Sequence, residues 1–170
     1  GQPLGCLMGS DVIEVAKEGG QAADSIDYQN ILKMYSAMWN GGRKNAVWIA
    51  NHSCIPWLMQ LSIPIGTAGA HIPVLKEESG KMSILGRPLY LHEGMAALGD
   101  VGDIAFCDFS QYYVGLRREM AIDKSIAPGW LADTISYRIL MRFDGQSTWS
   151  SPLTPAKGTT QSPFITLATR

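Results

Sequence analysis

The sequence predicts an α+β fold in which a mixed central sheet is flanked by two helices and continues into a long-stranded β extension. Three patterns support this prediction: an amphipathic helix in the first quarter, an all-apolar strand beside a second helix, and one long stretch of two-residue alternation. A chain in which helices come first and a series of strands follows is typical of this class.

Residues 11–15 are expected to form a short strand, and the amphipathic helix comes next, with Asp27 as its cap. Its apolar residues recur at three- and four-residue intervals and share one face: Tyr28, Ile31, Leu32, Tyr35, Met38 and Trp39. Gly41 can end the helix in the left-handed conformation. The apolar run 46–50 suits a strand covered on both faces. Pro56 is compatible with the first turn of a second helix.

The periodicity is lost across residues 63–77, where prolines and glycines are scattered. We expect a long loop there, and such loops in compact domains are usually functional or disordered. Strands are expected after the loop, at residues 84–91, 103–107, 112–116 and 120–122. Between the last two, the charged residues 117–119 are expected to form a hairpin turn.

The clearest strand spans residues 134–143. One face carries only apolar side chains: Ile135, Tyr137, Ile139, Met141 and Phe143. The other face includes Arg138 and Arg142. A strand of this length exceeds the usual ~5–6 residues. Asp144-Gly145 is a strong signal for a hairpin turn, and a short strand at residues 164–168 closes the chain.

Composition excludes several classes of protein. Charged residues make up 17% of the 170 residues, with 14 basic against 15 acidic, whereas soluble domains usually have ~25%. The basic residues do not cluster, which argues against a dedicated nucleic-acid surface. No apolar run approaches a membrane span. Three cysteines without paired spacing argue against a disulfide framework and for a reducing compartment. The chain begins at Gly1 rather than Met, which suggests a processed product or a fragment.

No catalytic, cofactor or metal site is predicted, and no enzymatic activity is expected. His52 and Cys54 lack the second pair of ligands that a zinc site needs. Asp100, Asp103 and Asp108 lie close together, but the glycines among them indicate turns rather than a cation site.

Several short motifs occur in a familiar order. They are Gly1-Gln2-Pro3-Leu4-Gly5, Leu85-Gly86-Arg87-Pro88-Leu89, Phe106-Cys107-Asp108-Phe109-Ser110-Gln111-Tyr112, Arg142 with Asp144-Gly145, and Phe164-Ile165-Thr166-Leu167. In this order the chain resembles the C-terminal part of the tailed-bacteriophage major capsid protein family. Cys107 stands where that family commonly has Gly, and the loop 152–162 is longer than typical.

The resemblance implies a structural subunit of the virion that self-assembles into pentamers and hexamers and closes an icosahedral shell around DNA. It implies an axial domain at residues 11–126, and a peripheral domain made of the leading segment 1–10 and the strands of residues 127–170. Implied partners are copies of the same chain, scaffolding and portal proteins, and DNA held only non-specifically, with no membrane. Synthesis in the host cytoplasm is also implied. The family's N-terminal arm, extended loop and spine helix would precede Gly1, so this chain alone is not expected to close a shell.

Two sets of residues are expected at subunit interfaces. The small residues Gly66, Ala68, Gly69 and Ala70 would allow close approach at the capsomer axis. Arg138 and Arg142 would pair with acidic groups on a preceding segment or a neighbouring copy.

Two other functions stay open at this point. A small enzyme would need His71 and His92 to converge with Asp100 or Asp103 in a pocket. An interaction module unrelated to shells would be a compact monomer whose own chain wholly covers the apolar face from Ile135 to Phe143.

Overall fold

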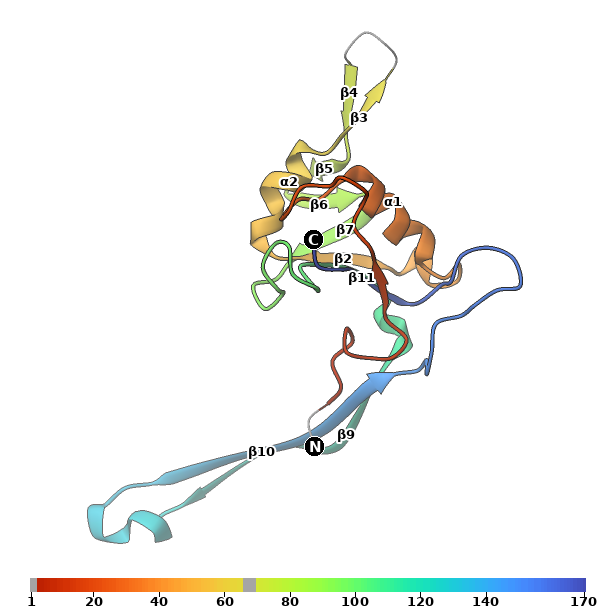
Figure 1. The fold of residues 1–170 in the computed structure, drawn as a ribbon. Coiled ribbons are helices and arrows are strands. Elements are labelled where there is room, and N and C mark those ends of the chain that lie inside the picture. Colours follow the sequence, from red (N-terminus) through yellow and green to blue (C-terminus); the bar gives the residue numbers. More distant parts are fainter. Residues whose placement is uncertain (1–2, 66–69) are drawn as a thin grey trace.

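The main body of the protein is a seven-stranded mixed sheet (Figure 1). The computed structural model describes residues 3–65 and 70–170. The strands lie in the order β1 (Ile13–Val15), β11 (Phe164–Leu167), β8 (Ile104–Cys107), β2 (Val47–Ala50), β7 (Arg87–Leu91), β6 (Lys81–Ile84) and β5 (Leu75–Glu78). The pairs β1–β11 and β2–β7 are parallel and the others antiparallel. The predicted α+β class with a mixed central sheet is confirmed.

Two α-helices pack on this body, α1 (Tyr28–Ala37) and α2 (Ile55–Gln60). Asp27 is the N-cap residue of α1, and its amide donates to the Asn30 side chain at 2.9 Å. The helix ends before Trp39 because Met38 turns to an extended conformation and pairs with Ser162. The predicted left-handed end at Gly41 is therefore wrong, and Gly41 begins the short 3-10 helix η1 (Gly42–Lys44) with φ −68°. Pro56 lies in the first turn of α2, as predicted.

The core lies between the sheet and α1. Trp48 and Phe106 are fully buried and stack with ring centroids 4.2 Å apart. The Trp48 indole donates to the Ile84 carbonyl at 3.1 Å, which satisfies its buried N–H. Along β8, Ile104 and Phe106 face this core, while the alternate residues Ala105 and Cys107 face a smaller cluster on the opposite side of the sheet.

Most of the described residues in the segment predicted to be a structureless loop, residues 63–77, instead form strands. β3 (Ser62–Ile65) pairs antiparallel with β4 (Ala70–Pro73), and this hairpin projects from the sheet (Figure 1). Its prolines made it look irregular in the sequence, but a two-stranded ribbon has open edges where proline is tolerated. β5 then begins at Leu75.

A second hairpin extends from the body in another direction (Figure 1). β9 (Tyr112–Ser125) pairs antiparallel with β10 (Ser136–Ser147), and the 3-10 helix η4 (Ala127–Ala132) forms its tip. The long strand predicted at 134–143 is confirmed and extends to Ser147. Both predicted turns are wrong, because Asp144 pairs with Gly115 and Arg118 with Arg142 inside the ladder. The charged residues 117–119 coincide with a register shift, as expected for a β-bulge.

The remaining 3-10 helices are η2 (His52–Cys54) and η3 (Phe109–Gln111). The predicted boundary between residues 126 and 127 falls at the hairpin tip, and β11 lies in the main sheet. The assignment of axial and peripheral domains stays a prediction.

A buried ion pair holds the C-terminal residue against the sheet. The Arg170 guanidinium binds both carboxylate oxygens of Asp103, and both side chains are 0% exposed. The same carboxylate accepts from the amides of Gly99 at 3.1 Å and Ile104 at 2.7 Å. The guanidinium also donates to the Ser25 carbonyl. The pair therefore joins the chain end, β8 and the segment before α1.

Replacing Arg170 by Met should lower the free energy of unfolding by about 3–5 kcal/mol, because the Asp103 carboxylate would stay buried without its cation. Urea denaturation measures the change. Lys33→Met is the matched control, since Lys33 forms a more exposed pair with Glu18 at 2.6 Å, and its loss should change stability by less than about 1 kcal/mol. Equal effects of the two substitutions would contradict the role of the buried pair.

Candidate assembly surface

The β9–β10 hairpin has one face covered with exposed apolar side chains. Opposite residues in an antiparallel pair share a face, and the register pairs Ile139 with Ile122 and Phe143 with Leu116. We call this set the apolar face: Val114, Leu116, Ile122, Tyr137, Ile139, Met141 and Phe143. These seven side chains are between 48% and 67% exposed.

Such a face is unusual for a chain that folds alone. Monomeric proteins rarely expose apolar patches larger than a few hundred Å², and larger patches mark interaction surfaces. Nothing in the described part of the chain packs over the apolar face closely enough to bury it. This observation contradicts the interaction-module alternative, which required the Ile135–Phe143 side to be covered by the chain itself.

The opposite face of the hairpin includes both predicted interface arginines, because Arg138 and Arg142 alternate with the apolar residues of β10. Arg138 pairs with Asp123 of β9, with Nη2 and Oδ2 2.8 Å apart. Arg138 therefore finds its acidic partner within the same chain. Arg142 lies opposite Arg118 in the ladder, and its expected role at an interface stays a prediction.

The Arg138 contact changes the acidity of Asp123. Its hydrogen bond, and then its positive charge, lower the pKa of the Asp123 carboxyl below the ordinary value. A lowered folded-state pKa means that the pair stabilises the hairpin above the usual aspartate pKa of ~3.9. That contribution is lost as pH falls through the lower folded value.

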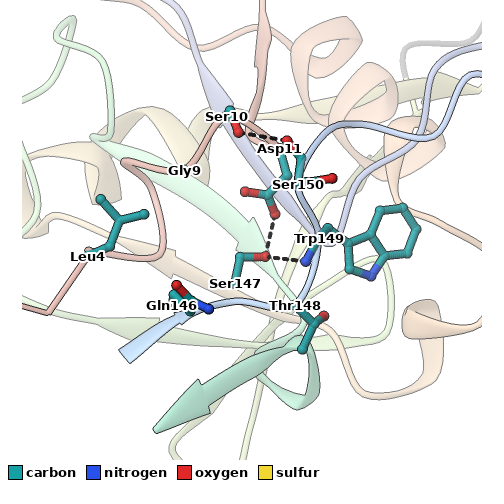
Figure 2. Close-up of a pocket in the computed structure, with 9 residues that line it drawn as sticks. All are labelled: Leu4, Gly9, Ser10, Asp11, Gln146, Ser147, Thr148, Trp149 and Ser150. Atoms are coloured by element: carbon teal, nitrogen blue, oxygen red, sulfur yellow. Dashed lines mark hydrogen bonds between the residues drawn. The ribbon is translucent and has the colours of Figure 1, made fainter. Parts of the chain in front are cut away.

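The base of the hairpin is fixed to the body at a polar junction (Figure 2). The N-terminal segment, residues 3–12, runs beside the end of β10, and the two enclose a cavity of about 310 Å³. Buried Asp11 accepts from the Ser147 hydroxyl at 2.6 Å, and the Trp149 amide donates to that hydroxyl at 3.2 Å. The Leu4 amide donates to the Gly145 carbonyl at 2.9 Å.

A second set of contacts fixes the other side of the base. The Gln111 side chain accepts from the Trp149 indole at 3.1 Å, and its carbonyl accepts from the Thr148 amide at 2.9 Å. The Trp149 ring also packs on Trp39, at 5.6 Å between centroids. These contacts hold the hairpin at a defined angle to the sheet, so the apolar face is presented by a rigid support.

The other predicted interface residues lie at the β3–β4 hairpin. Gly66, Ala68 and Gly69 fall outside the described residues, and Ala70 begins β4, where it pairs with Ile65. Their expected place at a capsomer axis stays a prediction.

The enzyme alternative gains no support from the geometry. His92 borders an apolar cavity of about 630 Å³ that Asp100 and Asp103 do not line. Asp103 is instead bound by Arg170, and the side chain of His71 lies outside the described part. Across residues 3–65 and 70–170, no group of three or more His, Cys, Asp or Glu side chains is placed to hold a metal ion. No helix in this range is long and apolar enough to cross a membrane.

Sequence reasoning missed half of the apolar face. The apolar residues of β9 alternate as they do in β10, but the charged residues 117–119 interrupt them and were interpreted as a turn. Had that triplet been interpreted as a bulge, residues 112–122 would have been predicted as the matching partner strand. The contacts of Asp11 and Gln111 at the base of the hairpin cannot be predicted from local sequence patterns, because each joins residues more than 35 positions apart.

Replacing Arg138 by Gln should raise the pKa of Asp123 toward ~3.9, since it removes the cation that stabilises the carboxylate. An NMR titration of the Asp123 side chain measures this shift. Arg142→Gln is the control, because Arg142 makes no contribution to the lowered pKa of Asp123. An Asp123 pKa that is the same in the unchanged protein and the Arg138→Gln variant would show that the ion pair does not form in solution.

Comparison with known proteins identifies the fold. The chain is similar to the capsid of a native GTA particle computed with C5 symmetry, with a TM-score of 0.66 and 16% identity over 97% of this chain and 55% of that chain. It is also similar to the capsid of an empty GTA particle computed with C5 symmetry, with a TM-score of 0.53 and 16% identity over 81% of this chain and 40% of that chain. The chain thus spans about half the length of these capsid chains.

No curated protein matches the chain. The model of the phage capsid family, in contrast, matches residues 1–158, which is most of the sequence. The capsid-type fold and the resemblance inferred from the motifs are both confirmed by these findings. The chain belongs to the phage capsid family.

Proposed function

We propose that this chain is part of a structural capsid subunit, and that copies of the complete protein form the pentamers and hexamers of an icosahedral shell enclosing DNA. Membership of the phage capsid family supports a structural role in the virion. The observation that carries the proposal is the apolar face on a rigidly supported hairpin.

The energetics favour burial of this face in an assembly. Burying a large apolar side chain fully is worth roughly 1.5–3 kcal/mol, and the side chains of the apolar face begin about half exposed. Together they would contribute on the order of 5–10 kcal/mol before the free-energy cost of association. A two-stranded ribbon is at best marginally stable in water by itself, so covering it would also make the hairpin more rigid.

The proposed occupants of the apolar face come from the complete capsid protein. Our proposal is that the spine helix expected from the family resemblance and neighbouring copies share the apolar face. The two hairpins leave the sheet in different directions (Figure 1), which supports contacts at two separate interfaces. In this proposal β3–β4, with Gly66, Ala68, Gly69 and Ala70, lies at the capsomer axis, and β9–β10 lies toward the capsomer edge.

Other expected partners follow from the same proposal. Scaffolding and portal proteins would contact the assembled shell, and DNA would be held without sequence specificity. A net charge of −1 without basic clusters favours weak contact with DNA over a dedicated binding surface. The protein would be made in the host cytoplasm and would reside in the virion.

Replacing Ile139 by Asp in the complete capsid protein should reduce the yield of closed particles by at least about tenfold. A carboxylate buried in an apolar interface costs several kcal/mol, and each 1.4 kcal/mol is tenfold in an equilibrium constant. Electron microscopy and sedimentation measure the yield.

Ser136→Asp is the matched control, because Ser136 lies on the same strand but faces the other side of the hairpin. It should assemble like the unchanged protein. Circular dichroism of each variant checks that the sheet still folds. Normal particles from a folded Ile139→Asp protein would refute a role of the apolar face in assembly.

A further inference from the structure

Two cysteines distant in the sequence meet on the side of the sheet opposite α1. Cys6 lies in the N-terminal segment, and Cys107 is the last residue of β8. Cys6 packs against the cluster formed by Ala105, Cys107 and Phe164. The two side chains are within hydrogen-bonding reach of each other. Neither thiol takes part in the assembly surface described above.

The backbone fixes the position of both thiols. Cys107 pairs with Phe164 on one side and Val47 on the other, and it is 1% exposed. Cys6 sits in a turn in which the Met8 amide donates to the Gly5 carbonyl at 2.9 Å. Cys6 is only partly buried, whereas Cys107 is buried, so Cys6 is the more accessible residue of the pair.

The environment divides the two thiols into a nucleophile and a resolving partner. The hydrogen bond from Cys107, helped by backbone amides, lowers the pKa of Cys6 to about 7. The same contact and burial raise the pKa of Cys107. A thiol whose pKa is near ambient pH is the best attacking group in thiol–disulfide exchange. Once Cys6 is bonded to another sulfur, it is no longer a thiolate. Its interaction with Cys107, which is the largest cause of the raised pKa of Cys107, is then removed.

We propose that Cys6 and Cys107 form a disulfide when the protein meets a small-molecule disulfide oxidant such as glutathione disulfide. The Cys6 thiolate attacks one sulfur of the oxidant, which forms a mixed disulfide and releases one thiol. The Cys107 thiolate then attacks the Cys6 sulfur and releases the second thiol. Both cysteines are oxidised by one electron each, and the oxidant is reduced to two thiols.

The bond would attach the N-terminal segment, which contacts the base of the hairpin, covalently to the sheet. The N-terminal segment that holds Cys6 also contacts the hairpin base, through the Leu4 amide to Gly145 and through the Tyr112 hydroxyl to the Leu4 carbonyl. In a reducing compartment the thiols stay free and this junction depends on hydrogen bonds. After transfer to oxidising surroundings, the link from Cys6 to β8 would limit movement of the apolar face relative to the sheet.

The test exposes the purified chain to glutathione disulfide at pH 7.5 and follows it by thiol counting in denaturant, peptide mapping and thermal unfolding. Three free thiols should fall to one, and mass spectrometry should find the peptides of Cys6 and Cys107 linked. The unfolding temperature should rise by on the order of 10 °C, because the bond closes a long loop. Reduction should reverse both changes.

Cys6→Ser should abolish the linked peptide and the rise in unfolding temperature. Cys54→Ala is the control and should retain both, since Cys54 is fully buried and its pKa is raised to about 11 by burial and by Asp103. The linked peptide is read in the unchanged protein, so the test does not depend on any variant folding. Cys6 remaining as a stable mixed disulfide with glutathione, or three thiols remaining free, would overturn the proposal.

Discussion

A two-stranded antiparallel ribbon cannot bury its own faces, and this constraint leaves the β9–β10 hairpin with an exposed apolar face. β9 and β10 extend away from the sheet, so their apolar residues have no partner in the described part of the chain. A single hairpin of this kind is marginally stable in water. We therefore propose that other polypeptide covers the apolar face in the assembled capsid.

The sheet serves as the rigid support for this ribbon. Trp48 and Phe106 fill its core, and the Asp103–Arg170 pair fixes the chain end beside β8. The base of the hairpin is then held by Asp11 on one side and Gln111 on the other. These contacts restrain the base of the hairpin relative to the sheet.

Much of the fold could be predicted from local patterns. The apolar spacing of α1, the proline in the first turn of α2 and the alternation of β10 are each local patterns within one element. Errors arose where tertiary pairing overrides local preference. Asp144-Gly145 has the composition of a turn but continues the ladder opposite Gly115 and Val114, and Ser162 ends α1 early by pairing with Met38. The apolar face was only half predicted, because its β9 side is interrupted by a bulge.

The most direct test of the assembly account is oxidative footprinting of Met141, which lies on the apolar face and is 49% exposed. Hydrogen peroxide converts an accessible methionine to its sulfoxide, and mass spectrometry reads the rate at that residue. Met8, which is exposed and lies outside the hairpin, provides the internal reference. The account predicts that Met141 is oxidised readily in the isolated chain and at least about tenfold more slowly, relative to Met8, in assembled particles of the complete protein. Equal relative rates in the two states would contradict burial of the apolar face in the shell.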